Sequence, residues 1–139
     1  MNKEINDLIM SFTSEMQKWE MYAENIDEGT LSESKINSLL KKELKNIFTR
    51  YCTTKERKQG RINNIFHGGR GSYDYNPSET EITEITEITE KGKNFEVAVT
   101  DSKNENNYLY VIHKKSETYL IDSKKRYSSW KKKWVSDTL

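Results

Sequence analysis

The segment from residue 61 to residue 71 contains side chains that would suit a phosphate-binding loop. His67 stands beside two glycines, and Arg61 and Arg70 lie on either side of them. A phosphate loop needs a preceding strand, a defined glycine spacing and a helix N-terminus after it. Here a helical pattern precedes the glycines and a polar loop follows them. The sequence therefore favours an ordinary loop over a phosphate site.

The thiol and imidazole groups of the chain are few and scattered. Cys52, His67 and His113 have no spacing typical of metal ligands, so we expect no metal and no other cofactor. Cys52 follows Tyr51 at the end of a helical pattern, where a packed cysteine is commoner than a nucleophile. His113 ends an apolar run, where a lightly packed histidine is ordinary. We therefore expect no catalytic residue among these three.

The segment KKRYSSWKKKW at 124–134 combines cations with aromatic rings. This composition is typical of surfaces that bind nucleic acid through phosphate contacts and base stacking. In the alternative interpretation the rings pack into the core while the ammonium groups reach water. Acidic blocks elsewhere in the chain would repel a polyanion. We therefore favour the packed tail and expect no nucleic-acid partner.

Residues 71–90 carry six acids and no Lys or Arg. An acidic surface attracts a basic protein partner and speeds its association. The same charges could instead protect an exposed edge strand from aggregation, and both interpretations stay open. The candidate partner-binding residues are Asp74, Glu79, Glu81, Glu84, Glu87 and Glu90.

Length and composition indicate one cytoplasmic domain. The 139 residues fit a single domain, which we place at 1–139. The net charge of +1 argues against a general polyanion binder. A single cysteine fits a reducing compartment. The N-terminal segment lacks the features of a signal peptide, and no apolar run is long enough to span a membrane.

Two amphipathic helices are expected at the start of the chain. Apolar residues in 3–26 recur at three- and four-residue steps, which gathers them on one stripe. A second helix is expected over about 32–51, where Thr30 and Glu33 have capping-box spacing and Ser32 is a competing cap. Neither helix can cover its apolar stripe alone, so each needs the other or a sheet. The glycine-rich stretch 53–77 is expected to be a loop, ordered only if Phe66, Tyr73 and Tyr75 hold it in place.

The second half has the character of an antiparallel sheet. The triplet ITE occurs three times within 79–90. A straight strand would place Ile85 on the face opposite Ile82 and Ile88, and a bulge would return it to the buried side. Further strands are expected at 94–100, 107–114 and 117–123, and the apolar centre of 107–114 suggests a strand covered on both faces. The tail 124–139 is expected to be a last strand or turn that lays its aromatic rings over the sheet.

Four segments carry a recognisable family pattern. They are YCTTKER at 51–57, YDYNP at 73–77, YLYVIHKK at 108–115 and YLIDSKKRYSSW at 119–130. In this order and separation, over about 48–134, they resemble the NTF2-fold immunity proteins of bacterial polymorphic toxin systems. The chain departs from the pattern at Tyr119, where the family usually has Trp, and at the ITE repeat. The N-terminal helix matches in character only.

The resemblance implies a cone-shaped α+β fold, with N-terminal helices packed against a curved antiparallel sheet of four or more strands. It also implies a non-enzymatic role: binding a cognate toxin domain encoded nearby and neutralising it by stoichiometric occlusion. The partner is then a protein. From the residues we expect no membrane partner, and the oligomeric state stays open between monomer and homodimer.

Two alternatives from other functional classes remain. Cones of this type also host enzymes of the ketosteroid-isomerase kind, which need a carboxylate base in an apolar pocket and an oxyanion donor. Asp122 with Tyr110 or Tyr119 could supply these groups, although the polar segment 123–125 favours a solvated carboxylate. The other alternative is an RNA-binding module that uses the basic-aromatic tail.

The apolar patterns also predict the core. The residues expected to be mostly buried are Phe12, Trp19, Leu40, Leu44, Phe48, Val97, Val99, Leu109, Val111, Leu120 and Ile121.

Overall fold

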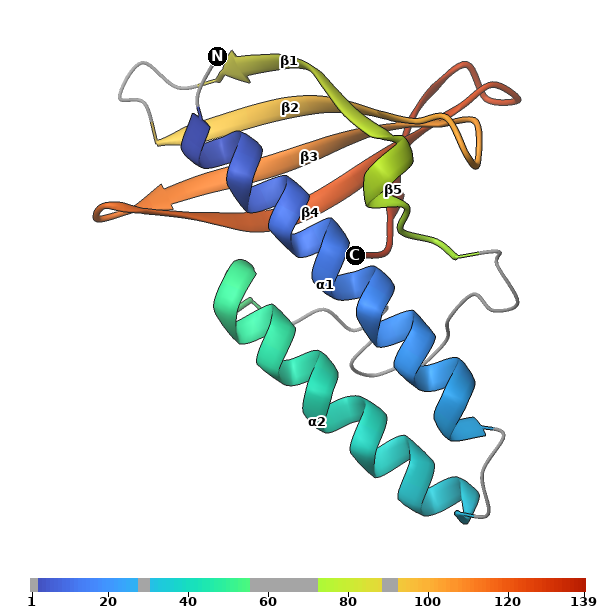
Figure 1. Ribbon diagram of the computed structural model, residues 1–139. Helices are drawn as coiled ribbons and strands as arrows, with labels where there is room; N and C mark the ends of the chain where they lie inside the picture. The colour runs from blue at the N-terminus through green and yellow to red at the C-terminus, as the bar shows by residue number, and fades with distance from the viewer. Residues whose placement is uncertain (1–2, 28–30, 56–72, 89–92) are drawn as a thin grey trace.

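The computed structural model describes residues 3–27, 31–55, 73–88 and 93–139. Two α-helices come first, and an antiparallel sheet of five strands follows (Figure 1). The strands lie in chain order across the sheet, so β1 and β5 are its edges. The elements are α1 (Lys3–Asp27), α2 (Glu33–Tyr51), the 3-10 turn η1 (Pro77–Glu79), β1 (Thr80–Glu87), β2 (Asn94–Asp101), β3 (Asn106–Lys115), β4 (Thr118–Ser128) and β5 (Lys133–Asp137). This is the α+β arrangement that the sequence predicts, with N-terminal helices followed by an antiparallel sheet.

The helices form where the apolar periodicity places them. The α1 stripe of Ile5, Ile9, Phe12 and Met16 is fully buried. Ser32 caps α2, because its hydroxyl accepts a hydrogen bond from the Lys35 amide at 3.2 Å. Side-chain acceptors of this kind satisfy one of the free N–H groups in the first turn.

One core lies between the helices and the face of the sheet that they cover, which we call the inner face. Alternation along the strands places Val97, Val99, Tyr110 and Ile112 on this face, and all four are buried. The Phe12 ring of α1 meets the Phe48 ring of α2 edge-on, with the ring centroids 6.0 Å apart. The core therefore joins both helices and the sheet.

Eight of the eleven residues predicted for the core are buried, and the other three are not. Leu109, Val111 and Leu120 are only half-buried, because alternation places them on the opposite, outer face of the sheet. The prediction that the third strand is covered on both faces was therefore wrong. Among the described residues, both helices lie on the inner side.

A bulge in β1 explains how two isoleucines of the ITE repeat, three residues apart, lie on the same face of the strand. The pairing with β2 shifts between Ile82 and Glu84, so Thr83 is the extra residue. Ile82 then lies opposite Val99 and Ile85 opposite Val97, both on the inner face. A three-residue repeat can keep its isoleucines on one face of a strand only with such an insertion. The expected return of Ile85 to the buried side is confirmed.

The last part of the chain differs from what the sequence indicated. The fourth strand was expected to end at 123, but β4 continues to Ser128 and pairs there with β5. The aromatic rings of the tail do not cover the core. Tyr127 and Trp134 are each 40% exposed, and Trp130, between the two strands, is 87% exposed. The favoured packed-tail interpretation was wrong on this point.

The segment before η1 is held against α1. The buried Glu20 carboxylate accepts a hydrogen bond from the Asp74 amide at 3.0 Å, and the Tyr73 hydroxyl donates to Glu24 at 2.6 Å. The Tyr75 ring is buried edge-on against Phe12. Tyr73 and Tyr75 thus hold the chain in place as expected, whereas Phe66 and the candidate loop around His67 lie outside the described residues.

Candidate functional site

The candidate acids of β1 lie on two different faces of the sheet. Register places Glu81 opposite Thr100 and Glu84 opposite Ala98, so both side chains belong to the outer face. The bulge at Thr83 brings these two acids to the same face, although they are three residues apart. Glu87 lies opposite Phe95 and belongs to the inner side, beyond the helices. Glu90 lies outside the described residues.

Asp74 and Glu79 are separated from the β1 glutamates. Asp74 lines a small polar pocket beside β5, and Glu79 ends η1, where the Ser102 hydroxyl donates to its carboxylate at 3.3 Å. The six candidate acids therefore form no single cluster. The part that the structure brings together is the outward pair Glu81 and Glu84 on an edge strand.

Asp122 occupies a second bulge, in β4. Val111 pairs with Ser123 and Ile112 with Ile121, which leaves Asp122 as the extra residue. Its carboxylate accepts hydrogen bonds from the Thr53 hydroxyl at 2.8 Å and the Lys55 ammonium at 2.9 Å. Thr53 itself joins β4 through its amide, which donates to the Ile121 carbonyl at 2.9 Å. Asp122 therefore fastens the chain after α2 to the sheet.

The electrostatics of Asp122 do not suit a catalytic base. Partial burial raises the pKa of Asp122, but the hydrogen bonds from Lys55 and Thr53, with His113 nearby, outweigh it and leave the pKa below its ordinary value. An isomerase base needs an apolar pocket and a pKa that stays near or above the ordinary value. The geometry of Asp122 gives the isomerase alternative no support.

A lysine is buried between the inner face of the sheet and the segment before η1. Lys124 is 4% exposed, and its ammonium lies 4.7 Å from the Tyr75 ring centroid and 4.6 Å from that of Tyr108. Asp137 of β5 pairs with it at 3.4 Å. Burial raises the pKa of Tyr108 to about 12, so this hydroxyl stays neutral beside the ammonium. Paired and ring-stacked, Lys124 has the contacts of a structural cation.

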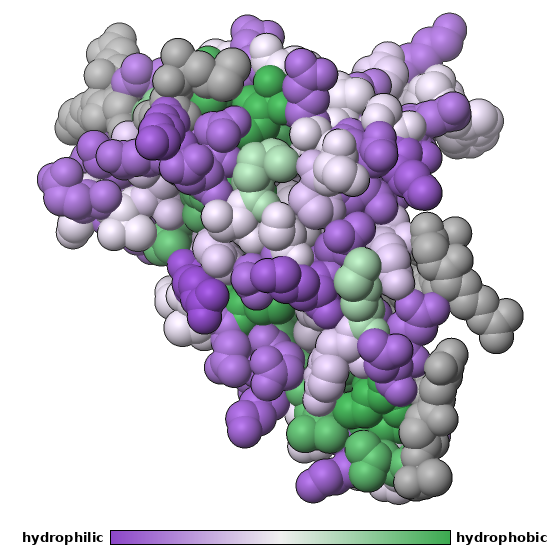
Figure 2. Space-filling model, in the orientation of Figure 1, coloured by the Kyte–Doolittle hydropathy of each residue, from purple (hydrophilic) through white to green (hydrophobic). Residues whose placement is uncertain are grey.

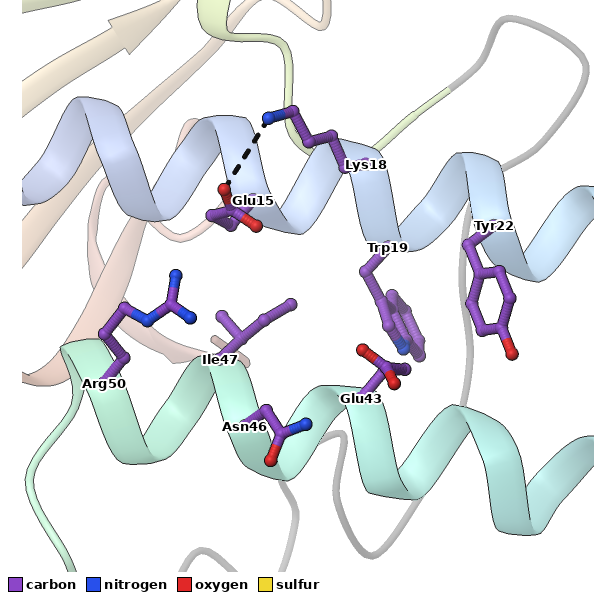
Figure 3. A pocket seen from close by; sticks show the side chains of 8 residues that line it. All are labelled: Glu15, Lys18, Trp19, Tyr22, Glu43, Asn46, Ile47 and Arg50. Carbon is purple, nitrogen blue, oxygen red and sulfur yellow. Dashed lines mark ion pairs between the residues drawn. The ribbon is translucent and has the colours of Figure 1, made fainter.

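The described residues line a pocket at the edge of the sheet and a groove between the two helices. A pocket of about 250 Å³ opens beside Lys124 and Asp137 at the start of β3. A groove of about 330 Å³ runs between the helices, where Trp19 points from α1 toward α2 (Figure 3). The groove is lined by Glu15, Lys18, Trp19, Tyr22, Glu43, Asn46, Ile47 and Arg50. Its two acids and two cations give a charged partner no preferred sign. The described residues hold no cluster of His, Cys, Asp or Glu that could bind a metal ion.

Sequence reasoning missed the exposed aromatic residues at the β4–β5 end of the sheet. The Tyr127 and Trp134 rings meet edge-on across the two strands, with centroids 5.5 Å apart. The available signal was the absence of any acid between Asp122 and Asp137 beside six cations. Six cations in one segment repel one another and need water around them. They are therefore hard to place beside a closed core, which favours a segment that extends into solvent. Reasoning also missed the buried Glu20, whose signal was an acid inside the apolar stripe of the first helix.

No helix among the described residues is long and apolar enough to cross a membrane. The surface seen from the helix side is largely hydrophilic, with apolar areas confined to small patches (Figure 2).

Comparison with known proteins gives the family. The profile described as NTF2 fold immunity protein matches residues 4–138. A relative, Immunity protein RhsIA of Dickeya dadantii (strain 3937), is 31% identical over 136 residues, which are 95% of this chain and 93% of the relative. No solved structure matches the chain. Because the family match runs through both helices and all five strands described above, this chain belongs to the NTF2-fold immunity protein family.

Proposed function

We propose that this immunity protein binds one cognate toxin domain, encoded nearby in a polymorphic toxin system, and neutralises it by stoichiometric occlusion in the cytoplasm. The observation that carries the proposal is the family match over residues 4–138, together with a similar relative that is named an immunity protein. Binding suits the described residues better than catalysis does. The Asp122 carboxylate is bonded to Thr53 and Lys55, and the interior cation is paired with Asp137.

The acids around β1 are the proposed toxin-binding residues. The stretch 71–90 carries six acids and no cation, and the three that lie on the edge strand β1, Glu81, Glu84 and Glu87, give that edge of the sheet a negative field. Such a field attracts a basic surface over about one Debye length, roughly 8 Å at physiological salt. The set consists of Asp74, Glu79, Glu81, Glu84, Glu87 and Glu90. The same charges also discourage self-association of the edge strand.

The direct test is co-expression of this chain with the toxin domain encoded beside it. We expect the host to grow only when both are present, and the purified pair to migrate as a complex of one antidote to one toxin domain. A catalytic antidote would instead protect at far below equal amounts. Failure to rescue growth, with no complex formed, would refute the proposal.

A further inference from the structure

The outer face of the sheet has the properties of a protein interface. Alternation along the strands places four apolar residues at its centre: Ala98, Leu109, Val111 and Leu120. All four are partly exposed, and the described helices lie on the other side of the sheet. Ile88, just after β1, continues this face and is 46% exposed. Water therefore contacts an apolar strip that crosses the sheet.

An aromatic pair closes one end of this strip. Lys124, Arg126 and Asp137 line the inner-side pocket, so the residues that alternate with them, Tyr127 and its partner Trp134, belong to the outer face. The Lys125 ammonium, on the same face, lies 3.9 Å from Glu96 of β2, an ion pair that spans β3. Because Glu96 is on the outer face, this pair supports the outward direction of the odd-numbered residues of β4 that follow the bulge at Asp122. Exposed Trp and Tyr at the centre or flank of an apolar face are the residue types that most often anchor interfaces.

The two edges of the outer face carry opposite charge. Glu81 and Glu84 lie on the β1 edge, whereas Lys125 and the turn cations Lys131 and Lys132 lie at the β4–β5 edge. Four strand spacings of about 4.8 Å separate the edges by roughly 19 Å. That distance is about two Debye lengths, so each edge acts as a separate field on a partner.

The outer face is also of suitable size. Five strands of about eight residues cover roughly 24 Å by 26 Å, or about 600 Å². A stable interface takes about 800 Å² from each partner. The exposed Trp130 and its hairpin can supply the remainder.

We infer that the toxin domain lies across the outer face of the sheet, with a basic region against Glu81 and Glu84 and an acidic region, holding an apolar pocket, against Tyr127 and Trp134. This inference rests on the proposed function, since it names the surface that the cognate toxin contacts. The acids on the inner side, such as Glu87, then steer the toxin without touching it.

A protein partner fits this surface better than a nucleic acid does. A single-stranded nucleic acid could bind along the cations at the β4–β5 edge. The apolar strip and the acidic β1 edge would add nothing to its binding free energy. The edge-on contact of Tyr127 with Trp134, at an interplanar angle of 73°, also offers no flat platform for successive bases.

The test measures dissociation of the purified complex with the toxin domain encoded beside this chain. We expect Tyr127→Ala and Trp134→Ala each to raise the dissociation rate about 10-fold or more, as loss of an interface anchor does. Tyr22→Ala is the matched control, because Tyr22 is a similarly exposed ring on α1, on the other side of the molecule. We expect its dissociation rate to equal that of the unaltered protein.

A second measurement does not depend on substitutions, which could themselves disturb the β4–β5 hairpin. Hydroxyl-radical footprinting of the unaltered protein should show oxidation of Tyr127 and Trp134 falling several-fold on toxin binding, while that of Tyr22 does not change. Unprotected Tyr127 and Trp134 in a complex that forms normally would overturn the inference and leave the proposed function intact. Absence of any complex would refute the proposed function itself.

Two further outcomes would overturn the choice of partner. Protection of Tyr127 and Trp134 without toxin, in a species that sedimentation shows to be a dimer, would assign the face to a second copy of this chain. A single-stranded oligonucleotide that displaces the toxin and protects the same rings would assign it to nucleic acid.

Discussion

Lys124 is a charged residue that the fold buries and supplies with partners. Its ammonium lies among tyrosine rings and is paired with Asp137. Buried pairs of this kind contribute little net stability, but removing one partner leaves the other uncompensated.

We expect Lys124→Ala to lower the free energy of unfolding by about 3 kcal/mol, because it leaves a cavity and an unpaired Asp137. Lys124→Met keeps most of the volume and loses the charge, so it should cost markedly less. Urea denaturation of the three proteins measures the difference. Equal losses in both variants would show that the charge, not the packing, is what the ring cluster requires.

Asp122 should make stability depend on pH in the acid range. Its pKa is lower in the folded chain than in the unfolded one, so its contribution is complete above the unfolded pKa of about 3.9 and is lost as the pH falls through the folded pKa. Asp122→Asn should therefore destabilise the protein at neutral pH by about 1–2 kcal/mol and by less near pH 3. Urea denaturation at a series of pH values measures this. A loss that does not vary with pH would mean that the carboxylate charge is irrelevant to its contacts with Lys55 and Thr53.

At the scale of the elements, α2 depends on its tertiary contacts. Its Leu40, Leu44 and Phe48 are its only buried residues, and its opposite face is charged and exposed. A helix of this composition has little stability by itself and is held by the burial of one stripe.

We expect Leu44→Ala to cost about 2–5 kcal/mol through the cavity that it leaves. Lys45→Ala, at the neighbouring exposed position, is the matched control and should change stability by less than about 0.5 kcal/mol. Thermal or urea unfolding followed by circular dichroism measures both. A small effect of Leu44→Ala would mean that α2 does not share the core of the sheet.

At the scale of the whole molecule, the net charge is small, but positive and negative side chains are concentrated in different parts of the surface. The net charge is +1, yet the glutamates of β1 and the cations of the β4–β5 hairpin lie at opposite edges of one sheet. A molecule of this kind orients a partner as it approaches.

We expect the double substitution Glu84→Lys and Glu87→Lys to slow association with the toxin domain, and to do so more at low salt than at high salt. Folding should hardly change, since both side chains are exposed. Stopped-flow mixing over a range of salt concentrations gives the rates. Glu43→Lys, an exposed acid on α2, serves as the control for a change of charge elsewhere. Association rates that match those of the control at every salt concentration would place the binding surface away from β1.

The sequence by itself determined the elements and the family of this protein. Apolar periods of three to four residues located both helices, and alternation with turn residues located the first three strands and the start of the fourth, because these patterns depend on local geometry alone. The spacing of Ile82 and Ile85 suggested that a bulge could place both on one face, and the structure has this bulge at Thr83. Ordered motifs such as YCTTKER and YLIDSKKR were enough to identify the family.

Only the tertiary structure decided which face each residue takes and what it meets there. Leu109 and Val111 are as apolar as their neighbours, but a one-residue step along a strand turns a side chain to the other face. Lys124 is one of six cations in its segment, and the bulge at Asp122 alone turns it inward onto Tyr75 and Tyr108. Burial of the Lys124 charge depends on rings from other parts of the chain, Tyr75 and Tyr108, which no local pattern records.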